Sequence, residues 1–154
     1  MTADIHIREA CRDDVAALAA MFAQDSLGGH GDTADAADLH LYLAAFDRIS
    51  ASPNDRLFVA MIDDEVVGTF QTTLITSLTG RGATNLTVEA VHTRHDRRGM
   101  GIGAAMVRHA IEQGRANGVR LVQLMSNAAR QDAHRFYERL GFRHSHYGFK
   151  MKMP

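Results

Sequence analysis

A run of glycines preceded by two arginines is the part of the sequence best suited to binding a ligand. It reads Arg97-Arg98-Gly99-Met100-Gly101-Ile102-Gly103, follows a predicted strand and opens a predicted helix. Glycines let a ligand approach the backbone closely, and the N–H groups at a helix N-terminus point at an anion. Arg98 adds a guanidinium that can hold phosphate through two hydrogen bonds. The spacing therefore predicts a pyrophosphate cradle in preference to a simple glycine-rich turn.

Two common phosphate-binding patterns do not fit this run. The P-loop of nucleoside triphosphatases needs a lysine directly after its last glycine, and the sequence has none there. A dinucleotide fingerprint needs Gly-x-Gly-x-x-Gly and an acidic residue at the end of the next strand. Here Gly101 is followed by Gly103, and the predicted strand 119–126 contains no acidic residue. Both patterns are therefore excluded.

The nine histidines of the chain raise the question of a metal site. His144 and His146 could place both rings on one face of an extended segment, and His92 and His95 flank the glycine run. The sequence has no His-Glu-x-x-His motif and no cysteine pair, the arrangements typical of zinc sites. We therefore expect scattered histidines and no metal.

Composition limits the class of protein. With 154 residues, 45% apolar and 23% charged, the chain is expected to form one globular domain over 1–154. A net charge of −1 argues against a nucleic-acid or membrane-surface partner, and no apolar stretch is long enough to span a membrane. Cys11, the only cysteine, cannot form an intrachain disulfide, which favours a cytoplasmic location.

The secondary structure that must position the glycine run differs between the two halves of the chain. The first half predicts one strand and two helices, separated by a glycine-containing loop, and then three strands that follow one another closely. The second half alternates helix and strand, with Gly118 and Gly141 placed to end its two helices. This order predicts an α+β domain with a mixed sheet. The predicted strands cover 4–10, 57–62, 66–78, 83–93, 119–126 and 142–153, the last as an edge strand or hairpin. The first predicted helix begins after Asp14, and the other three cover 35–50, 99–117 and 131–140.

Two motifs resemble those of one protein family. Arg98-x-x-Gly101-x-Gly103 resembles the Gln/Arg-x-x-Gly-x-Gly/Ala signature of the GNAT superfamily of acyl-CoA-dependent N-acetyltransferases. About thirty residues later, the stretch 133–142 resembles the Ala-x-x-Phe-Tyr-x-x-x-Gly-Phe pattern of the same superfamily. The order of elements matches as well, so the resemblance spans nearly the whole chain.

The loop before the second motif resembles a subgroup of this superfamily. Asn127 lies six residues before Ala133, whereas many members have three. This longer loop, together with Ser145, His146 and Phe149, is similar to the aminoalkylphosphonate N-acetyltransferases.

The resemblance implies a fold and a cofactor site. The fold would be a mixed, mostly antiparallel sheet of six to seven strands, flanked by about four helices, with a splayed strand pair at the acyl-CoA site. Acetyl-CoA would be the co-substrate, with its diphosphate held by Arg98 and the backbone N–H groups of 99–103. Its pantetheine would pair with the main chain at Val91 and Thr93, and Asn127 would contact the cofactor or a bridging water.

The resemblance also implies catalytic roles. The superfamily moves an acetyl group directly to a neutral amine, so it needs a proton acceptor for the amine and a proton donor for the thiolate. Tyr137 is the implied general acid, because a phenol is well matched to protonating a thiolate. Glu89 is the implied general base, working through water. In a regular strand His92 would face away from Glu89 and Val91, so we rank it lower.

The acceptor is expected to be a primary amine of a small molecule. The loop 25–33 could act as a lid, and Asp25 and Asp32 could attract an ammonium group, whereas Arg81 and Arg143 would suit a phosphonate. Two alternatives stay open: a peptide or protein N-acetyltransferase, and a non-catalytic CoA-binding module. The resemblance further implies a possible homodimer.

Overall fold

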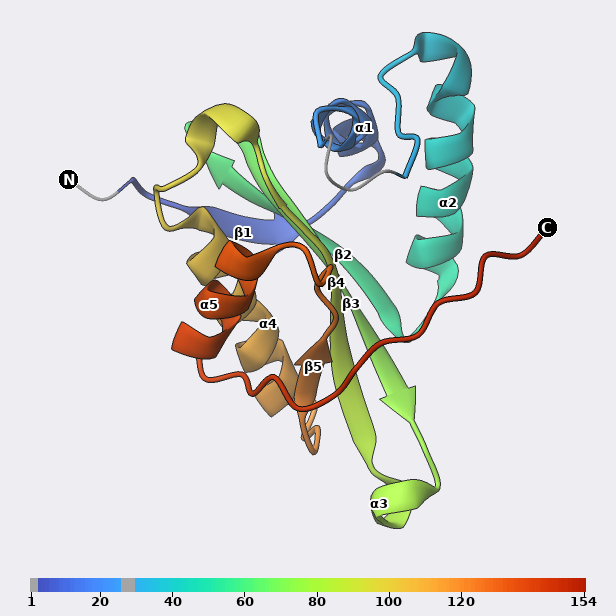
Figure 1. Cartoon of the computed structure of the whole chain (residues 1–154). Helices are drawn as coiled ribbons and strands as arrows, with labels where there is room; N and C mark the ends of the chain where they lie inside the picture. Colours follow the sequence, from blue (N-terminus) through green and yellow to red (C-terminus); the bar gives the residue numbers. More distant parts are fainter. Residues whose placement is uncertain (1–2, 26–29) are drawn as a thin grey trace.

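A twisted five-stranded sheet forms the centre of the computed structural model, which describes residues 3–25 and 30–154 (Figure 1). The strands lie in the order β1-β2-β3-β4-β5. The first four pair antiparallel, and β5 pairs parallel to β4. Short connections join β2 to β3 and β3 to β4, whereas the parallel pair of β4 and β5 needs a crossover, which a helix supplies. The strands are β1 (His6–Glu9), β2 (Asp55–Ile62), β3 (Glu65–Thr76), β4 (Thr84–Thr93) and β5 (Val122–Leu124).

Four helices lie on the two faces of the sheet, two on each (Figure 1). The helices α1 (Val15–Ala23) and α2 (Leu39–Ala51) cover one face. The other face carries α4 (Ile102–Ala116), which is the crossover between β4 and β5, and α5 (Gln131–Arg139). A fifth and very short helix, α3 (Thr79–Gly82), closes the hairpin between β3 and β4. None of the helices in the described part of the chain is long and apolar enough to cross a membrane.

Two apolar cores fix α4 and α1 to the sheet. On the α4 face, Ile102 and Met106 are fully buried against Phe70 and Val88 of the sheet. On the opposite face, a smaller core joins α1 to Val59 of β2. The four-residue spacing of the buried side chains in α4 is the spacing of one helix face, as the sequence predicts. The larger core therefore holds α4, and with it the glycine run at the start of this helix, in a fixed place beside β4.

Gly114 lets α4 lie close to the strand that follows it. A Cβ atom at this position would lie 2.9 Å from Cγ2 of Val122 and 3.0 Å from Cγ2 of Val119. Both are stiff β-branched side chains, so the helix would have to move away from β5.

We therefore expect Gly114→Ala to lower the free energy of unfolding by about 1 kcal/mol, even though alanine favours a helix. Urea titration followed by circular dichroism measures this change. Arg115→Ala, at an exposed neighbouring position, should stay within about 0.5 kcal/mol of wild type. A Gly114→Ala protein as stable as wild type would contradict this close packing.

The prediction of six to seven strands is wrong, because the sheet has five. The missing element is the predicted strand or hairpin over 142–153: the C-terminal tail (residues 142–154) has no regular secondary structure. Its alternating pattern of apolar residues is typical of a strand, but alternation yields a strand only where a partner edge pairs with it. The apolar side chains of this tail are instead exposed, from 81% to 94%, at Tyr147, Phe149, Met151 and Met153.

Candidate active site

The glycine run forms a tight loop at the N-terminus of α4. Gly99 and Gly101 have φ of +80° and +81°, a backbone conformation that side chains with a Cβ disfavour. A Cβ atom at either position would meet nothing within 4 Å, so the loop is open on its outer side. The helix begins at Ile102, and the N–H groups of its first turn have no acceptor within the helix. The loop thus offers open backbone donors at the positive end of a helix dipole, which suits a phosphate group.

Gly103 has a different reason for being glycine. A Cβ atom there would lie 3.3 Å from Cζ of Phe136 and 3.9 Å from Oγ1 of Thr93. Gly103 therefore lets α5 pack directly on the start of α4. This contact brings the two motifs of the sequence, about thirty residues apart, onto one site beside the end of β4.

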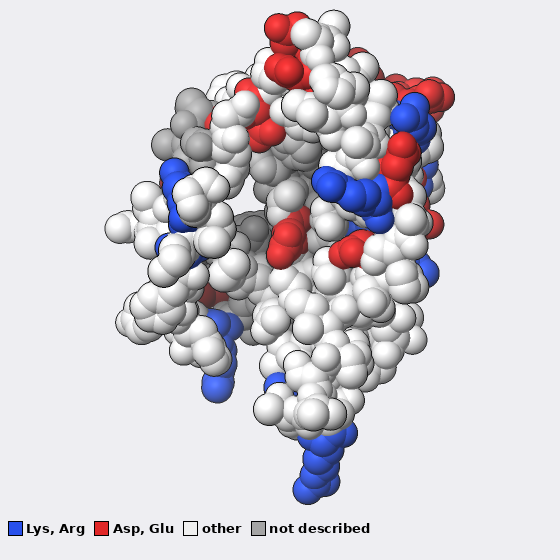
Figure 2. Space-filling model, turned by 90° about the vertical axis from the view of Figure 1, so that its right-hand side faces the viewer, with Lys and Arg blue, Asp and Glu red and all other residues white. Residues whose placement is uncertain are grey.

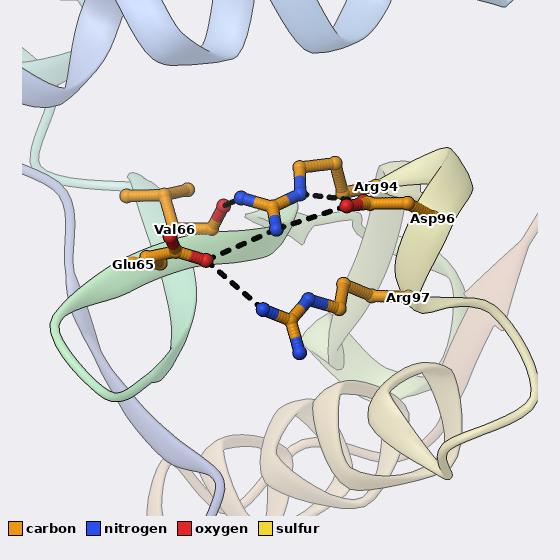
Figure 3. A network of polar contacts seen from close by, with 5 residues as sticks. All are labelled: Glu65, Val66, Arg94, Asp96 and Arg97. Atoms are coloured by element: carbon orange, nitrogen blue, oxygen red, sulfur yellow. Dashed lines mark hydrogen bonds and ion pairs between the residues drawn. The ribbon is translucent and has the colours of Figure 1, made fainter.

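A polar network fixes the segment that leads into the loop (Figure 3). Glu65, at the start of β3, accepts hydrogen bonds from Arg94 at 3.0 Å and from Arg97 at 3.1 Å. Arg94 also donates to the backbone carbonyl of Val66 and to the carboxylate of Asp96. These bonds lower the pKa of Glu65 and Asp96, chiefly through the Arg94 guanidinium. With both arginines held by carboxylates, Arg98 is the exposed guanidinium next to the loop, and it forms no ion pair within the described residues.

The end of β4 has a free edge on the side of β5. The two strands pair only from Leu86↔Val122 to Val88↔Leu124, whereas β4 continues to Thr93. Beyond Val88, the described residues give β4 no strand partner on this side. Main-chain groups of the segment 89–93 are therefore available to an extended ligand, as in strand addition. The segment contains the predicted pantetheine-binding residues Val91 and Thr93.

A β-bulge at Ala90 changes which side chains share a face of β4. Ala90 has φ of +52°, and the register with β3 shifts between Gln71↔Glu89 and Thr69↔His92. Because residues two apart on β3 share a face, so do their partners Glu89 and His92. Val91 instead packs with the core on the α4 face. The expectation that His92 faces away from Glu89 is thus wrong, since it assumed a regular strand.

The Tyr137 side chain lies largely buried in α5. Its ring packs edge-on against Phe136 and Phe142, with centroids 5.1 Å and 5.9 Å away. Burial raises the pKa of the phenol above its usual value, and the positive charge of Arg130 opposes this shift. The side chain therefore keeps its proton at neutral pH, as a general acid must.

Asn127 lies in the loop between β5 and α5 and shapes that loop. Its side-chain oxygen accepts a hydrogen bond from the backbone N–H of Ala129 at 2.9 Å. Its carbonyl accepts from the N–H of Arg130 at 2.9 Å and lies 2.9 Å from Nε2 of His134. Asn127 is thus a turn residue in this structure, and its predicted contact with the cofactor stays a prediction.

Three charged or titratable side chains meet just after the β4 bulge, around His92. The guanidinium of Arg130 binds both carboxylate oxygens of Asp25, at 2.8 Å and 3.1 Å. Nδ1 of His92 lies 3.7 Å from an oxygen of the same carboxylate. The cluster joins the end of α1, the end of β4 and the start of α5. Asp25 and His92 are separate candidates in the sequence and Arg130 is not, because nothing in a single sequence pairs residues 105 positions apart.

The molecule is hollowed on the side that carries α2. Figure 2 shows a recess near the middle of this face, with acidic side chains in and above it and basic side chains to its left, to its right and below it. The predicted lid glycines Gly28 and Gly29 lie outside the described residues. Within the described part of the chain, no group of three His, Cys, Asp or Glu side chains could hold a metal ion.

Comparison with family models identifies the family of this chain. The model of the acetyltransferase (GNAT) family matches residues 17–142. An aminoalkylphosphonate N-acetyltransferase from Salmonella typhimurium is 44% identical over 52 residues, which is 34% of this chain and 34% of that protein. A crystal structure described as a transcriptional regulator from Bacillus halodurans C-125 is 39% identical, with a TM-score of 0.93 over 97% of this chain and 100% of that chain. An aminoglycoside N-acetyltransferase in complex with CoA shares the fold at 14% identity, with a TM-score of 0.79 over 99% of this chain and 97% of that chain.

Proposed function

Because the chain belongs to the acetyltransferase (GNAT) family, we propose that it transfers the acetyl group of acetyl-CoA to a primary amine of a small molecule. Family membership makes the protein an acyltransferase that uses acetyl-CoA. One observation carries the proposal furthest: the open glycine loop lies directly beside the free edge of β4, with Gly103 next to Thr93. This arrangement supports the proposal, because a loop with open N–H groups at one end of a free strand edge matches the shape of a diphosphate joined to a pantetheine chain.

The residues present fit acyl-CoA. The N–H groups of the segment 99–103 and the guanidinium of Arg98 would hold the diphosphate. The main chain at Val91 and Thr93 would pair with the amides of the pantetheine. Bound in this way, acetyl-CoA supplies a thioester, an acyl group that an amine can attack directly.

The catalytic residues of the proposal are Tyr137 and the polar face of β4. Tyr137 donates its proton to the sulfur as the carbon–sulfur bond breaks. Glu89 and His92 share the face of β4 from which the amine can be deprotonated, and they are the two candidate proton acceptors, Glu89 through water as the resemblance implies. Both groups lie on the face toward α1, where the Phe22 ring contacts His92.

The acceptor class is proposed from the charges around this face. Asp25 and Asp32 favour an ammonium group, and Arg130 adds a positive donor for a second, acidic group of the substrate. Similarity to an aminoalkylphosphonate N-acetyltransferase over 52 residues supports such a mixed site. Peptide or protein amines are the competing acceptors.

A screen of primary amines with detection of released thiol tests the proposal. The panel should contain aminoalkylphosphonates, polyamines, amino sugars and amino acids, with a peptide array and labelled acetyl-CoA as the second arm. Transfer to a small amine supports the proposal, and transfer to peptides alone overturns the acceptor class.

A non-catalytic CoA-binding or regulatory module is the second candidate function. It is favoured by the similarity, over nearly all of both chains, to a structure described as a transcriptional regulator. Calorimetry separates the two candidates. A regulatory module would bind acetyl-CoA but transfer its acetyl group to no amine of either arm.

The C-terminal tail suggests how two chains could associate. Its apolar residues Tyr147, Phe149 and Met151 alternate with Gly148 and the lysines, and they are exposed in this single chain. We propose that the tail pairs as a strand in a homodimer, where this stripe becomes buried.

Light scattering after size-exclusion chromatography should then give a mass twice that of one chain. Phe149→Ser should shift the protein toward the mass of one chain, because it removes a large side chain from the stripe. Lys150→Ser, on the opposite side of an extended tail, should leave the dimer intact. A wild-type protein with the mass of one chain would refute the dimer.

A further inference from the structure

His92 is held in a position that the reaction proposed above does not yet explain. Its side chain is only 20% exposed, at the edge of the Phe22 ring, with ring centroids 4.9 Å apart. Its Nδ1 lies 3.7 Å from Oδ2 of Asp25, whose side chain is 10% exposed. A carboxylate beside one ring nitrogen favours the tautomer that keeps the proton on that nitrogen and leaves the other nitrogen free to accept one.

The charged and titratable groups around His92 come from β4 itself and from the segments next to α1, α2 and α5. Asp25 follows α1, Arg130 precedes α5, and His30 and Asp32 belong to the segment before α2. Asp32 is in turn held by the hydroxyl of Tyr42 on α2, at 2.8 Å. Glu89 shares its face of β4, as the register with β3 requires.

These surroundings act on the proton affinity of His92 in opposite directions. Burial lowers the pKa of the imidazole below its usual value and is the largest influence. The negative charge of Asp25 raises the pKa, and the positive charge of Arg130 lowers it. The imidazole is therefore neutral at pH 7 and has a lone pair available for a proton.

We infer that His92, oriented by Asp25, is the group that takes the proton from the acceptor ammonium. This inference rests on the proposed acetyl transfer and names the proton acceptor of that same site. Glu89 is less suited to this task, because it is exposed and in direct exchange with solvent. Arg130 is a positioning residue: it holds both oxygens of Asp25 and so fixes the carboxylate that orients His92.

The step balances in atoms and charge. A substrate ammonium gives one proton to the free ring nitrogen of His92, and the resulting lone pair on the amine forms a bond to the acetyl carbon. The carbon–sulfur bond breaks, and the sulfur takes the phenol proton of Tyr137. The second proton lost by the nitrogen restores Tyr137, and His92 releases its proton to solvent. The net products are the amide, CoA thiol and one proton.

The pH dependence of kcat/KM tests the inference, with the fastest amine of the panel as acceptor. In the wild type, kcat/KM should fall as the pH drops through the lowered pKa of His92, because the protonated imidazole cannot accept a proton. This fall at low pH is the acid limb of the profile. His92→Gln should remove the acid limb and lower kcat/KM at pH 7 by about 10- to 100-fold. His109→Gln is the matched control, since burial also lowers the pKa of His109, which packs against Phe58 and Phe70 away from the site. It should keep the limb.

Two conservative variants test the neighbours through a readout that a purely structural role would not produce. Asp25→Asn removes a negative charge, so the acid limb should move to lower pH by about one pH unit. Arg130→Gln removes a positive charge, so the limb should move to higher pH by a similar amount. These opposite shifts follow only if the limb reports His92 between the two charges.

Failure of the inference differs from failure of the proposed function. A wild type that binds acetyl-CoA but acetylates no amine would overturn the function. A wild type that acetylates the amine, with a limb that survives in His92→Gln, would overturn the role of His92. Loss of the limb in Glu89→Gln together with its survival in His92→Gln would assign the proton acceptor to Glu89 instead.

Discussion

Tyr137→Phe is expected to lower kcat by about 10²- to 10³-fold while the dissociation constant of acetyl-CoA stays within about twofold of wild type. The phenylalanine ring keeps the contacts with Phe136 and Phe142 but cannot donate a proton to the departing sulfur. Steady-state kinetics measure the first quantity, and calorimetry measures the second.

The chain offers a matched control for this variant. Tyr147 lies in the C-terminal tail, outside the proposed active site, and Tyr147→Phe keeps the aromatic ring that would contribute to the dimer, so this variant should leave kcat unchanged. The raised pKa of Tyr137 also predicts that its phenol stays protonated throughout the range from pH 6 to 9. Unchanged turnover in Tyr137→Phe would show that solvent, and not Tyr137, protonates the thiolate.

Gly101→Ala is expected to raise the dissociation constant of acetyl-CoA by about 10- to 50-fold, because a strained loop can no longer present its N–H groups together. Gly101 caps the N-terminus of α4 with φ of +81°, and a Cβ there would project into the open side of the loop. The variant thus loses both the backbone geometry and part of the space that a diphosphate would use.

The opposite end of the same helix supplies the control. Gly118 has φ of +64°, and a Cβ there would also meet nothing within 4 Å. Gly118→Ala should therefore bring a similar backbone strain, about 1–2 kcal/mol, without affecting acetyl-CoA binding. Comparing the two variants by calorimetry and by urea denaturation separates ligand binding from stability. Equal affinities in both would contradict a role for the loop in holding the diphosphate.

The local parts of the site were predictable from the sequence. Gly99, Gly101 and the start of α4 follow one another directly, and the geometry of a helix N-terminus is set by the residues within about one turn of it. The helix ends at Gly118 and Gly141 are local in the same sense, and both glycines have positive φ. Apolar spacing likewise predicted the buried face of α4, because that spacing is a property of the helix itself.

Pairing between distant segments was less predictable. The tail 142–153 has the alternation of a strand, yet alternation only shows that a segment could pair and does not supply the partner edge. The same limit explains why no pattern in the sequence indicates the ion pair between Arg130 and Asp25, which joins segments 105 residues apart.

The sequence by itself determined the order of the elements as far as α5, the glycine loop that we propose for acetyl-CoA, and the presence of a tyrosine suited to act as an acid. Only the tertiary structure decided which side chains share the face of β4 where we propose that the acceptor binds. One extra residue at the bulge of β4 reverses the alternation beyond Ala90, so His92 turns to the side of Glu89 and meets Asp25 and Arg130. A bulge arises from how two strands align, and that alignment depends on the packing of the whole sheet, which no local pattern of residues records.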